Sequence, residues 1–222
     1  MAVRPIVLAY STVREVLNLA PEQEGQIRRT VTHLKHGRHV PLPAGTVRAS
    51  HEDWDAAKAH PNMGGPPKGA FLFKRPVDVE RETDGRGFAP SGIFALTCPY
   101  GAPGDRLWVK ETWQALHVHI DPETGYGDDV TYAKQILPND GGGYWHAVYA
   151  ATDPAAYEHP QDRGFPWRSS THMPQWASRI TLEVTNVCVE PDEDDPWVWV
   201  LSVKRADQAL KAGSAPPTLL HV

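Results

Sequence analysis

The sequence predicts a mostly β (α+β) fold, a small closed or nearly closed β-barrel with one short N-terminal helix and long loop insertions. Three observations indicate this fold. The 222 residues are 41% hydrophobic and 22% charged, a composition typical of a chain with a buried core. The 21 prolines and 18 glycines favour turns and short elements over long helices. Several short runs alternate between apolar and polar residues, as strands with one buried face do.

The N-terminal segment predicts a strand followed by a short helix. The apolar run Pro5–Leu8 is the expected opening strand. Thr12 and Glu15 match the capping-box pattern that begins a helix, and apolar residues follow at helical spacing. Pro21 should end this helix after about two turns, because proline cannot continue a helical hydrogen-bond ladder.

Later strands are predicted where apolar residues alternate with polar ones or form short unbroken runs. A continuous apolar run such as the last one is typical of a strand covered on both faces. The predicted strands are 92–97, 106–113, 144–151, 179–185 and 197–201.

Two loop-rich stretches interrupt the predicted domain. Residues 41–92 carry clusters of Pro and Gly around a single strand-like piece at 70–73, and 121–143 is a second such loop. The stretch 41–92 does not offer enough apolar periodicity for a core of its own. We therefore predict one domain over 1–205 with two excursions, followed by a C-terminal tail at 206–222.

The charge distribution leaves two interpretations open. The net charge of −5 does not favour a nucleic-acid partner for the chain as a whole. However, residues 26–48 carry Arg and Lys without any acid, whereas acidic residues gather at 190–195. The basic stretch is either a contact for phosphate groups or a solvated loop.

Several classes of protein lack support in the sequence. Cys98 and Cys188 are far apart, which argues against a secreted disulfide framework, and no run of apolar residues reaches membrane length. His33, His36 and His39 lack the acidic or Cys partners of a metal site. We therefore expect a cytoplasmic protein that has no membrane partner and uses neither a metal nor a cofactor.

Glu111 is the candidate acid or base. It follows Leu107 and Val109 on the inward face of the predicted strand 106–113, where partial burial would raise its pKa. It would then line a ligand cleft. The alternative is a structural ion pair with a cation such as Arg28, Arg29 or Arg179.

Other residues are candidates for binding a nucleic acid. Arg28 and Arg29 carry guanidinium groups suited to phosphates or base edges, but they could instead pair with Glu111 or Glu183. Trp167 and Trp176 flank an irregular segment and could stack on a base. The full predicted set is Arg28, Arg29, Lys110, Trp167, His172, Trp176, Ser178 and Arg179.

Four parts of the sequence, taken in order, carry a resemblance to a known family. They are Ser11–Leu17 with Gln26–Arg29, Cys98–Trp113, Trp167 with Thr171–Thr185, and Pro196–Val200. The second and third parts are long and unusual, and together the four span most of the chain outside the two loops. They resemble ASCH-domain proteins of phages and prophages, and the resemblance implies a PUA-like β-barrel that binds RNA or a modified nucleoside.

Some ASCH-domain proteins hydrolyse modified nucleosides or cleave RNA, and this chain departs from their catalytic pattern. Those enzymes carry a Lys and a Thr after the helix, in a motif of the type Gly-x-Lys-Thr-x-Thr-Arg. Here residues 22–29 contain no Lys, and Ile27 stands where the Thr would be. The segment that supplies their catalytic Glu shrinks to 190–196.

Three functions follow as hypotheses. The first is a module that binds RNA or a modified nucleoside. The second is a hydrolase, either an acylcytidine amidohydrolase or a ribonuclease, in which Glu111 or His172 would replace the missing groups. The third is a phage accessory protein that binds another protein through its acidic segment 190–195.

Overall fold

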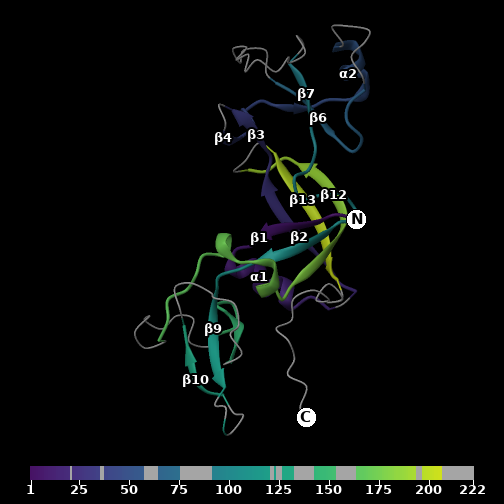
Figure 1. Ribbon diagram of the computed structural model, residues 1–222. Coiled ribbons are helices and arrows are strands. Elements are labelled where there is room, and N and C mark those ends of the chain that lie inside the picture. Colours follow the sequence, from purple (N-terminus) through teal and green to yellow (C-terminus); the bar gives the residue numbers. More distant parts are fainter. Residues whose placement is uncertain are drawn as a thin grey trace. The chain divides into compact units, whose positions relative to one another are not determined.

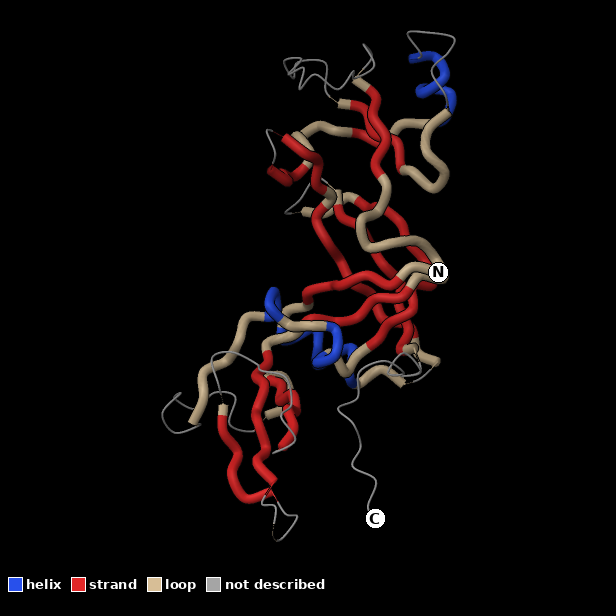
Figure 2. The backbone as a smooth tube through the Cα atoms, viewed as in Figure 1, coloured by secondary structure: helices blue, strands red, loops and turns tan. Residues whose placement is uncertain are grey.

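The computed structural model is mostly β, as predicted (Figures 1 and 2). It describes residues 1–20, 22–35, 38–57, 65–75, 92–120, 123, 127–132, 143–153, 164–193 and 197–206. The predicted tail beyond Ala206, the helix stop at Pro21 and much of both predicted excursions lie outside the described residues.

The chain divides into two compact units. Unit 1 comprises residues 1–25, 106–183 and 204–222, and unit 2 comprises 26–105 and 184–203. Strands β12 (Thr181–Glu190) and β13 (Val198–Arg205) contribute residues to both. The prediction of a single domain over 1–205 therefore stays a prediction.

Unit 1 holds the first strand and most of the middle of the chain. Its elements are β1 (Val3–Val7), α1 (Tyr10–Leu17), β8 (Arg106–Lys110), β9 (Trp113–Ile120), β10 (Gly127–Thr131), β11 (Gly143–Tyr149) and the 3-10 turns η1 (Ser170–His172) and η2 (Gln175–Ala177).

Two sheets position the residues of unit 1. In the five-stranded sheet, of order β1-β8-β12-β13-β2, β1 is parallel to β8 and β12 is antiparallel to it. The pairs Val7–Lys110 and Thr181–Trp108 set the register. In the sheet of order β10-β9-β11, Tyr149 lies opposite Trp113. The residues buried along β1, β8 and the start of β12 are Ile6, Leu107, Val109 and Leu182.

Unit 2 contains short strands around an aromatic core. Its elements are β2 (Glu24–Thr30), which begins in unit 1, β3 (Thr32–Lys35), β4 (Arg38–Pro41), β5 (Val47–Arg48), α2 (His51–Ala57), β6 (Phe71–Lys74) and β7 (Ile93–Leu96). Strands β3 and β4 form a hairpin, and β5-β6-β7 form a small sheet. The buried core residues are Val31, Leu42, Phe73, Phe94 and Trp199.

The predicted barrel stays a prediction. Each of the four sheets seen in the described part of the chain has two edges, so none closes on itself. The described residues form more strands than the ranges predicted from the sequence, because several strands of only two to five residues lie in segments rich in turn residues.

The helix prediction was right in place and wrong in its cap. Helix α1 begins at Tyr10, so Thr12 lies inside it, and the capping residue Ala9 makes no side-chain hydrogen bond. The Arg14 guanidinium instead lies 5.4 Å from the centre of the Tyr10 ring, an i,i+4 contact that supports the first turn.

A second helix, α2, lies within the stretch predicted as loop. Its start carries the capping box that α1 lacks. The Ser50 hydroxyl accepts from the Asp53 amide at 3.0 Å, and the Asp53 carboxylate accepts from the Ser50 amide at 2.7 Å. The Ser50 amide and the Ser50 hydroxyl, the latter at 2.8 Å, both donate to this carboxylate and lower the pKa of Asp53.

Two strand predictions also need correction. Strand β10 lies in the predicted loop 121–143, where it pairs with β9. The predicted strand 106–113 ends at Lys110, because the Glu111 amide donates to Met173 Sδ at 3.3 Å in place of a strand partner.

Neither helix in the described part of the chain has the length and hydrophobicity to span a bilayer.

Truncation of Ile6 tests the packing of unit 1. Ile6 is 1% exposed, and Ile6→Ala should lower the free energy of unfolding by about 2–5 kcal/mol through lost burial and a residual cavity. Val7 follows it on β1 and is 41% exposed, so Val7→Ala should cost no more than about 0.5 kcal/mol. Urea denaturation of both variants measures the difference, and equal losses would contradict the assignment of β1.

Candidate functional site

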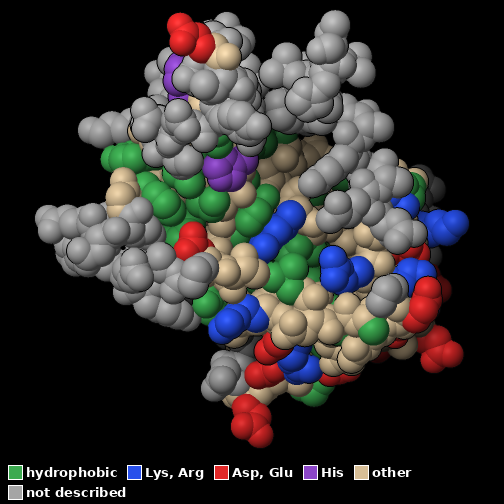
Figure 3. Space-filling view, turned by 90° about the horizontal axis from the view of Figure 1, so that it is seen from below, with side chains coloured by type: hydrophobic (Ala, Val, Ile, Leu, Met, Phe, Trp, Pro, Cys, Tyr) green, Lys and Arg blue, Asp and Glu red, His purple; other side chains and the backbone are tan. Residues whose placement is uncertain are grey.

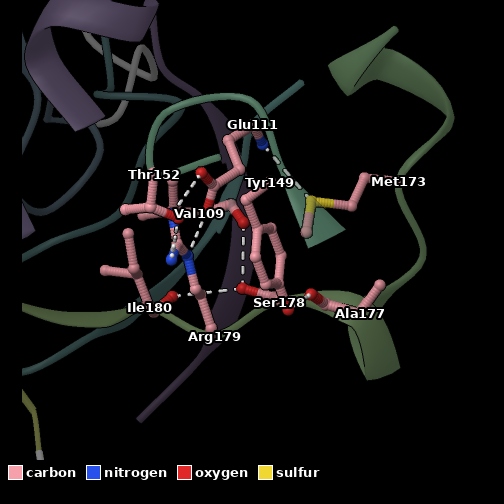
Figure 4. A network of polar contacts seen from close by, with 9 residues as sticks. All are labelled: Val109, Glu111, Tyr149, Thr152, Met173, Ala177, Ser178, Arg179 and Ile180. Atoms are coloured by element: carbon pink, nitrogen blue, oxygen red, sulfur yellow. Dashed lines mark hydrogen bonds and ion pairs between the residues drawn. The ribbon is translucent and has the colours of Figure 1, made fainter. Parts of the chain in front are cut away.

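A buried ion pair between Glu111 and Arg179 is the centre of the candidate site (Figure 4). Glu111 directly follows β8 and is 2% exposed, while Arg179 precedes β12. The Arg179 Nε donates to Glu111 Oε1 and Nη2 donates to Oε2, both at 2.9 Å. This two-pronged geometry satisfies both carboxylate oxygens and fixes the guanidinium plane.

The same guanidinium reaches the end of β11. Its Nη1 donates to Thr152 Oγ1 at 2.9 Å, and its central carbon lies 4.0 Å from the centre of the Tyr149 ring. The Tyr149 hydroxyl donates to the Ala177 carbonyl at 2.8 Å. Burial raises the pKa of Tyr149 to about 12, although the positive charge of Arg179 acts in the opposite direction. The phenol therefore stays protonated and can keep this hydrogen bond at neutral pH.

Two further contacts hold the segment 173–178 against β8 (Figure 4). Met173 is buried and accepts from the Glu111 amide, and the Ser178 hydroxyl lies 2.9 Å from the Val109 carbonyl, to which it donates. The segment is thus attached to Glu111 at its start and to Val109 at its end.

The pairing alternative for Glu111 is the one observed, with Arg179 as the partner. Each carboxylate oxygen accepts a hydrogen bond from the guanidinium. The carboxylate is therefore buried and held on both oxygens by the guanidinium, an arrangement that favours a structural role for Glu111. Arg179 and Ser178, predicted as binding residues, have their polar groups engaged in the same network.

Trp176 is the exposed aromatic residue of this segment. Its side chain on η2 is 36% exposed, and its ring lies edge-on to Trp113, with ring centres 5.8 Å apart and planes at 83°. Trp113 begins β9 and is 1% exposed. A large apolar side chain held at the surface by a fixed neighbour offers a flat face to a ligand.

Polar side chains also lie at the residues just before segment 173–178. The Lys110 ammonium donates to the Thr171 carbonyl and lies 5.5 Å from the centre of the Trp108 ring. His172 is exposed at the end of η1. Residues 171 and 172, just before segment 173–178, therefore present an imidazole and bind an ammonium group.

Trp167, the other predicted stacking residue, has a different neighbour. It is half-buried, and its ring lies edge-on to Phe165 at 5.2 Å between centres. The next residue, Arg168, donates from Nε to Gln114 Oε1 at 2.7 Å, and the Gln114 amide donates to the Pro166 carbonyl at 2.6 Å. Trp167 thus adjoins a polar network around a buried glutamine.

Arg28 and Arg29 belong to unit 2, whereas the other predicted binding residues belong to unit 1. Arg28 Nη2 lies 2.7 Å from Asp192 Oδ2, and Nη1 lies 3.2 Å from Glu190 Oε2. These bonds, above all the one to Asp192, raise the pKa of Arg28. The pairing alternative for Arg28 named Glu111 or Glu183, whereas its observed partners are Glu190 and Asp192, because the acidic segment folds back onto β2.

Glu183 also has a partner within its own unit. Its carboxylate lies 3.7 Å from the Lys204 ammonium, with about a third of each side chain exposed. This distance and exposure are typical of a weak surface ion pair.

Sequence reasoning missed several residues of the network. Tyr149, Thr152 and Met173 carry no motif, and they come together through the pairing of β11 with β9 and the fold of segment 173–178. Alternation predicted the inward face of β8, which placed Glu111 inside. Comparisons of the chain with models of protein families, with curated proteins and with solved structures gave no match.

Removal of the guanidinium should be strongly destabilising. Arg179→Leu leaves the Glu111 carboxylate buried without its partner and should lower the free energy of unfolding by about 3–5 kcal/mol. Glu111→Leu combined with Arg179→Leu should be more stable than Arg179→Leu alone, because no buried charge remains. Lys204→Met is the matched control and should cost no more than about 1 kcal/mol. The coupling would be contradicted if the double variant lost as much free energy of unfolding as Glu111→Leu alone and Arg179→Leu alone lose together.

The phenol of Tyr149 should give stability an alkaline pH dependence. Because its folded-state pKa of about 12 exceeds the unfolded value of 10.0, its contribution is complete below pH 10 and is lost as pH rises toward 12. The free energy of unfolding should fall by at most about 1.4 kcal/mol per pH unit in that window. Tyr149→Phe should lack this part of the slope, and Tyr10→Phe on α1 should retain it. Urea denaturation across the pH range measures the three slopes.

Proposed function

We propose that this protein binds RNA or a nucleoside, as the resemblance to PUA-like ASCH-domain proteins implies, through the segment 169–178. The observation that carries the proposal is the exposed Trp176 side chain, set edge-on against the buried Trp113. The buried ion pair of Glu111 with Arg179, together with Met173 and Ser178, holds the segment that carries it.

Base stacking is the interaction that this arrangement supports best. Stacking of a base on an aromatic side chain is worth about 1–3 kcal/mol and tolerates all four bases, since each has a π-face. A tryptophan that is already fixed by its neighbours loses less conformational entropy on binding than a free side chain does. Trp176 meets both requirements, because its ring is partly exposed and also packed against Trp113.

A cation attached to the segment would provide attraction for the phosphates of a nucleic acid. The Lys110 ammonium donates to the Thr171 carbonyl of this segment, and on the face shown in Figure 3 Lys and Arg side chains lie among hydrophobic ones. Because the net charge of the chain is −5, attraction for phosphates has to be local. Binding should therefore weaken as the salt concentration rises.

Binding without turnover is favoured over the hydrolase hypothesis. Glu111, the candidate acid or base, has both oxygens bound by Arg179. The acidic segment of the protein-binding hypothesis is likewise engaged, because Glu190 and Asp192 both pair with Arg28. The binding test below separates the three hypotheses. Product formation would replace the proposal by the hydrolase, and absence of affinity for every ligand of the panel would remove the proposal and leave the protein-binding hypothesis.

Replacement of the exposed tryptophan tests the proposal. A panel of short single-stranded RNAs, single-stranded DNA and modified nucleosides is titrated against the protein, with binding and product formation measured together. Trp176→Leu should weaken binding by about 1–3 kcal/mol, which is roughly 5- to 150-fold. Tyr132→Leu removes a side chain of similar exposure, 38%, and should leave affinity unchanged. Equal affinity of Trp176→Leu and the unmodified protein for every ligand of the panel would contradict the proposal.

A further inference from the structure

The part of the five-stranded sheet that belongs to unit 1 has one accessible face. Strand alternation and the register of β1, β8 and β12 place the buried Ile6, Leu107 and Leu182 on the inner face. The positions between them point to the opposite face, and their side chains are exposed or half-buried. These positions define the outer face and are Val3, Pro5, Val7, Arg106, Trp108, Lys110, Thr181 and Glu183.

The outer face carries an excess of positive charge. Arg106 and Lys110 lie on it in β8, and Lys204 of β13 adjoins it, because the Lys204 ammonium is 3.7 Å from the Glu183 carboxylate. Glu183 offsets one of these cations. In a chain whose net charge is −5, a local excess of cations is the condition for attracting phosphate groups.

An aromatic side chain lies at the centre of the outer face. Trp108 is half-buried and pairs with Pro5 of β1 on one side and with Thr181 of β12 on the other. Arg106 and Lys110 lie two residues before and after it, about 13 Å apart along the strand. Stacked nucleotides of one strand rise by about 3.4 Å each, so the face is longer than a single nucleoside. Aromatic side chains and cations on an open sheet are typical of domains that hold single strands.

Lys110 connects the outer face to the segment 169–178. Its ammonium donates to the Thr171 carbonyl and lies 5.5 Å from the centre of the Trp108 ring. Trp108 therefore adjoins the segment that carries Trp176, and all of these residues belong to unit 1. A strand with one base stacked on Trp176 can continue from there onto the outer face.

We propose that the outer face is a second binding site for single-stranded RNA, in which Trp108 stacks on a base while Arg106 and Lys204 contact phosphates. This inference rests on the proposed function and narrows its ligand to a single strand of several nucleotides, in place of an isolated nucleoside. Bases within a duplex are stacked on both faces, so they cannot stack on Trp108.

The salt dependence of binding tests the phosphate contacts. Oligouridylate and oligoadenylate of about eight nucleotides, a site size typical of small domains that hold single strands, are titrated at several salt concentrations. Arg106→Gln should reduce the slope of log affinity against log salt concentration by about 0.7, the value of one phosphate contact on a single strand. Arg4→Gln is the matched control, because Arg4 is exposed on β1 and alternation turns it to the inner face. It should leave the slope unchanged.

The length of the ligand tests the stacking position. Trp108→Leu should weaken binding of the oligomers by roughly 5- to 150-fold and leave the affinity for uridine and adenosine unchanged. Trp176→Leu should weaken the binding of oligomers and nucleosides alike. Lys204→Gln repeats the slope measurement at a second position on the protein surface, so the test does not depend on the folding of Trp108→Leu.

The outcomes separate this inference from the proposed function. An unchanged salt slope in both Arg106→Gln and Lys204→Gln, with affinity still dependent on Trp176, would overturn the role of the outer face and leave the binding function intact. Equal affinity of the unmodified protein for oligomer and nucleoside would do the same. Binding of duplex RNA as tightly as single-stranded RNA would overturn the ligand class. Absence of binding to every oligomer and nucleoside would remove the proposed function and this inference together.

Discussion

The ion pair between Glu111 and Arg179 is the interaction on which the arrangement of the candidate site depends. It joins the end of β8 to the start of β12, and its guanidinium also contacts Tyr149 and Thr152 beyond β11. A buried carboxylate is costly without a partner, so the residues that meet here are constrained to one geometry. As a result the Glu111 carboxylate is buried, and each of its oxygens accepts a hydrogen bond from the Arg179 guanidinium.

The accessible part of the candidate site is an aromatic side chain, Trp176. Met173 and Ser178 tie the segment 173–178 to β8, and Trp176 projects from that segment with part of its ring exposed. Its ring is fixed against the buried Trp113. A rigid, partly exposed aromatic side chain is the feature that favours the proposal of base stacking.

Much of the mostly β fold could be predicted from the sequence, because alternation places Leu107, Val109 and Glu111 on one buried face. The short strands in turn-rich segments could not be predicted from the sequence, because their pairing depends on residues far away in the chain. A capping-box pattern alone does not tell where a helix begins, because the pattern at Thr12 lies inside helix α1 whereas the one at Ser50 caps helix α2. The partners of the charged residues depend on tertiary structure, which is why the pairing of Arg28 with an acidic segment went unpredicted.

The most direct test of the account is to map where single-stranded RNA contacts the protein. Ultraviolet cross-linking of short single-stranded RNA, followed by mass spectrometry of the protein's peptides, locates the bases without any substitution. The account predicts cross-links within residues 169–178, with Trp176 among the modified positions. Cross-links confined to the basic stretch 26–48, with none in 169–178, would contradict it and transfer the binding function to residues such as Arg28 and Arg29.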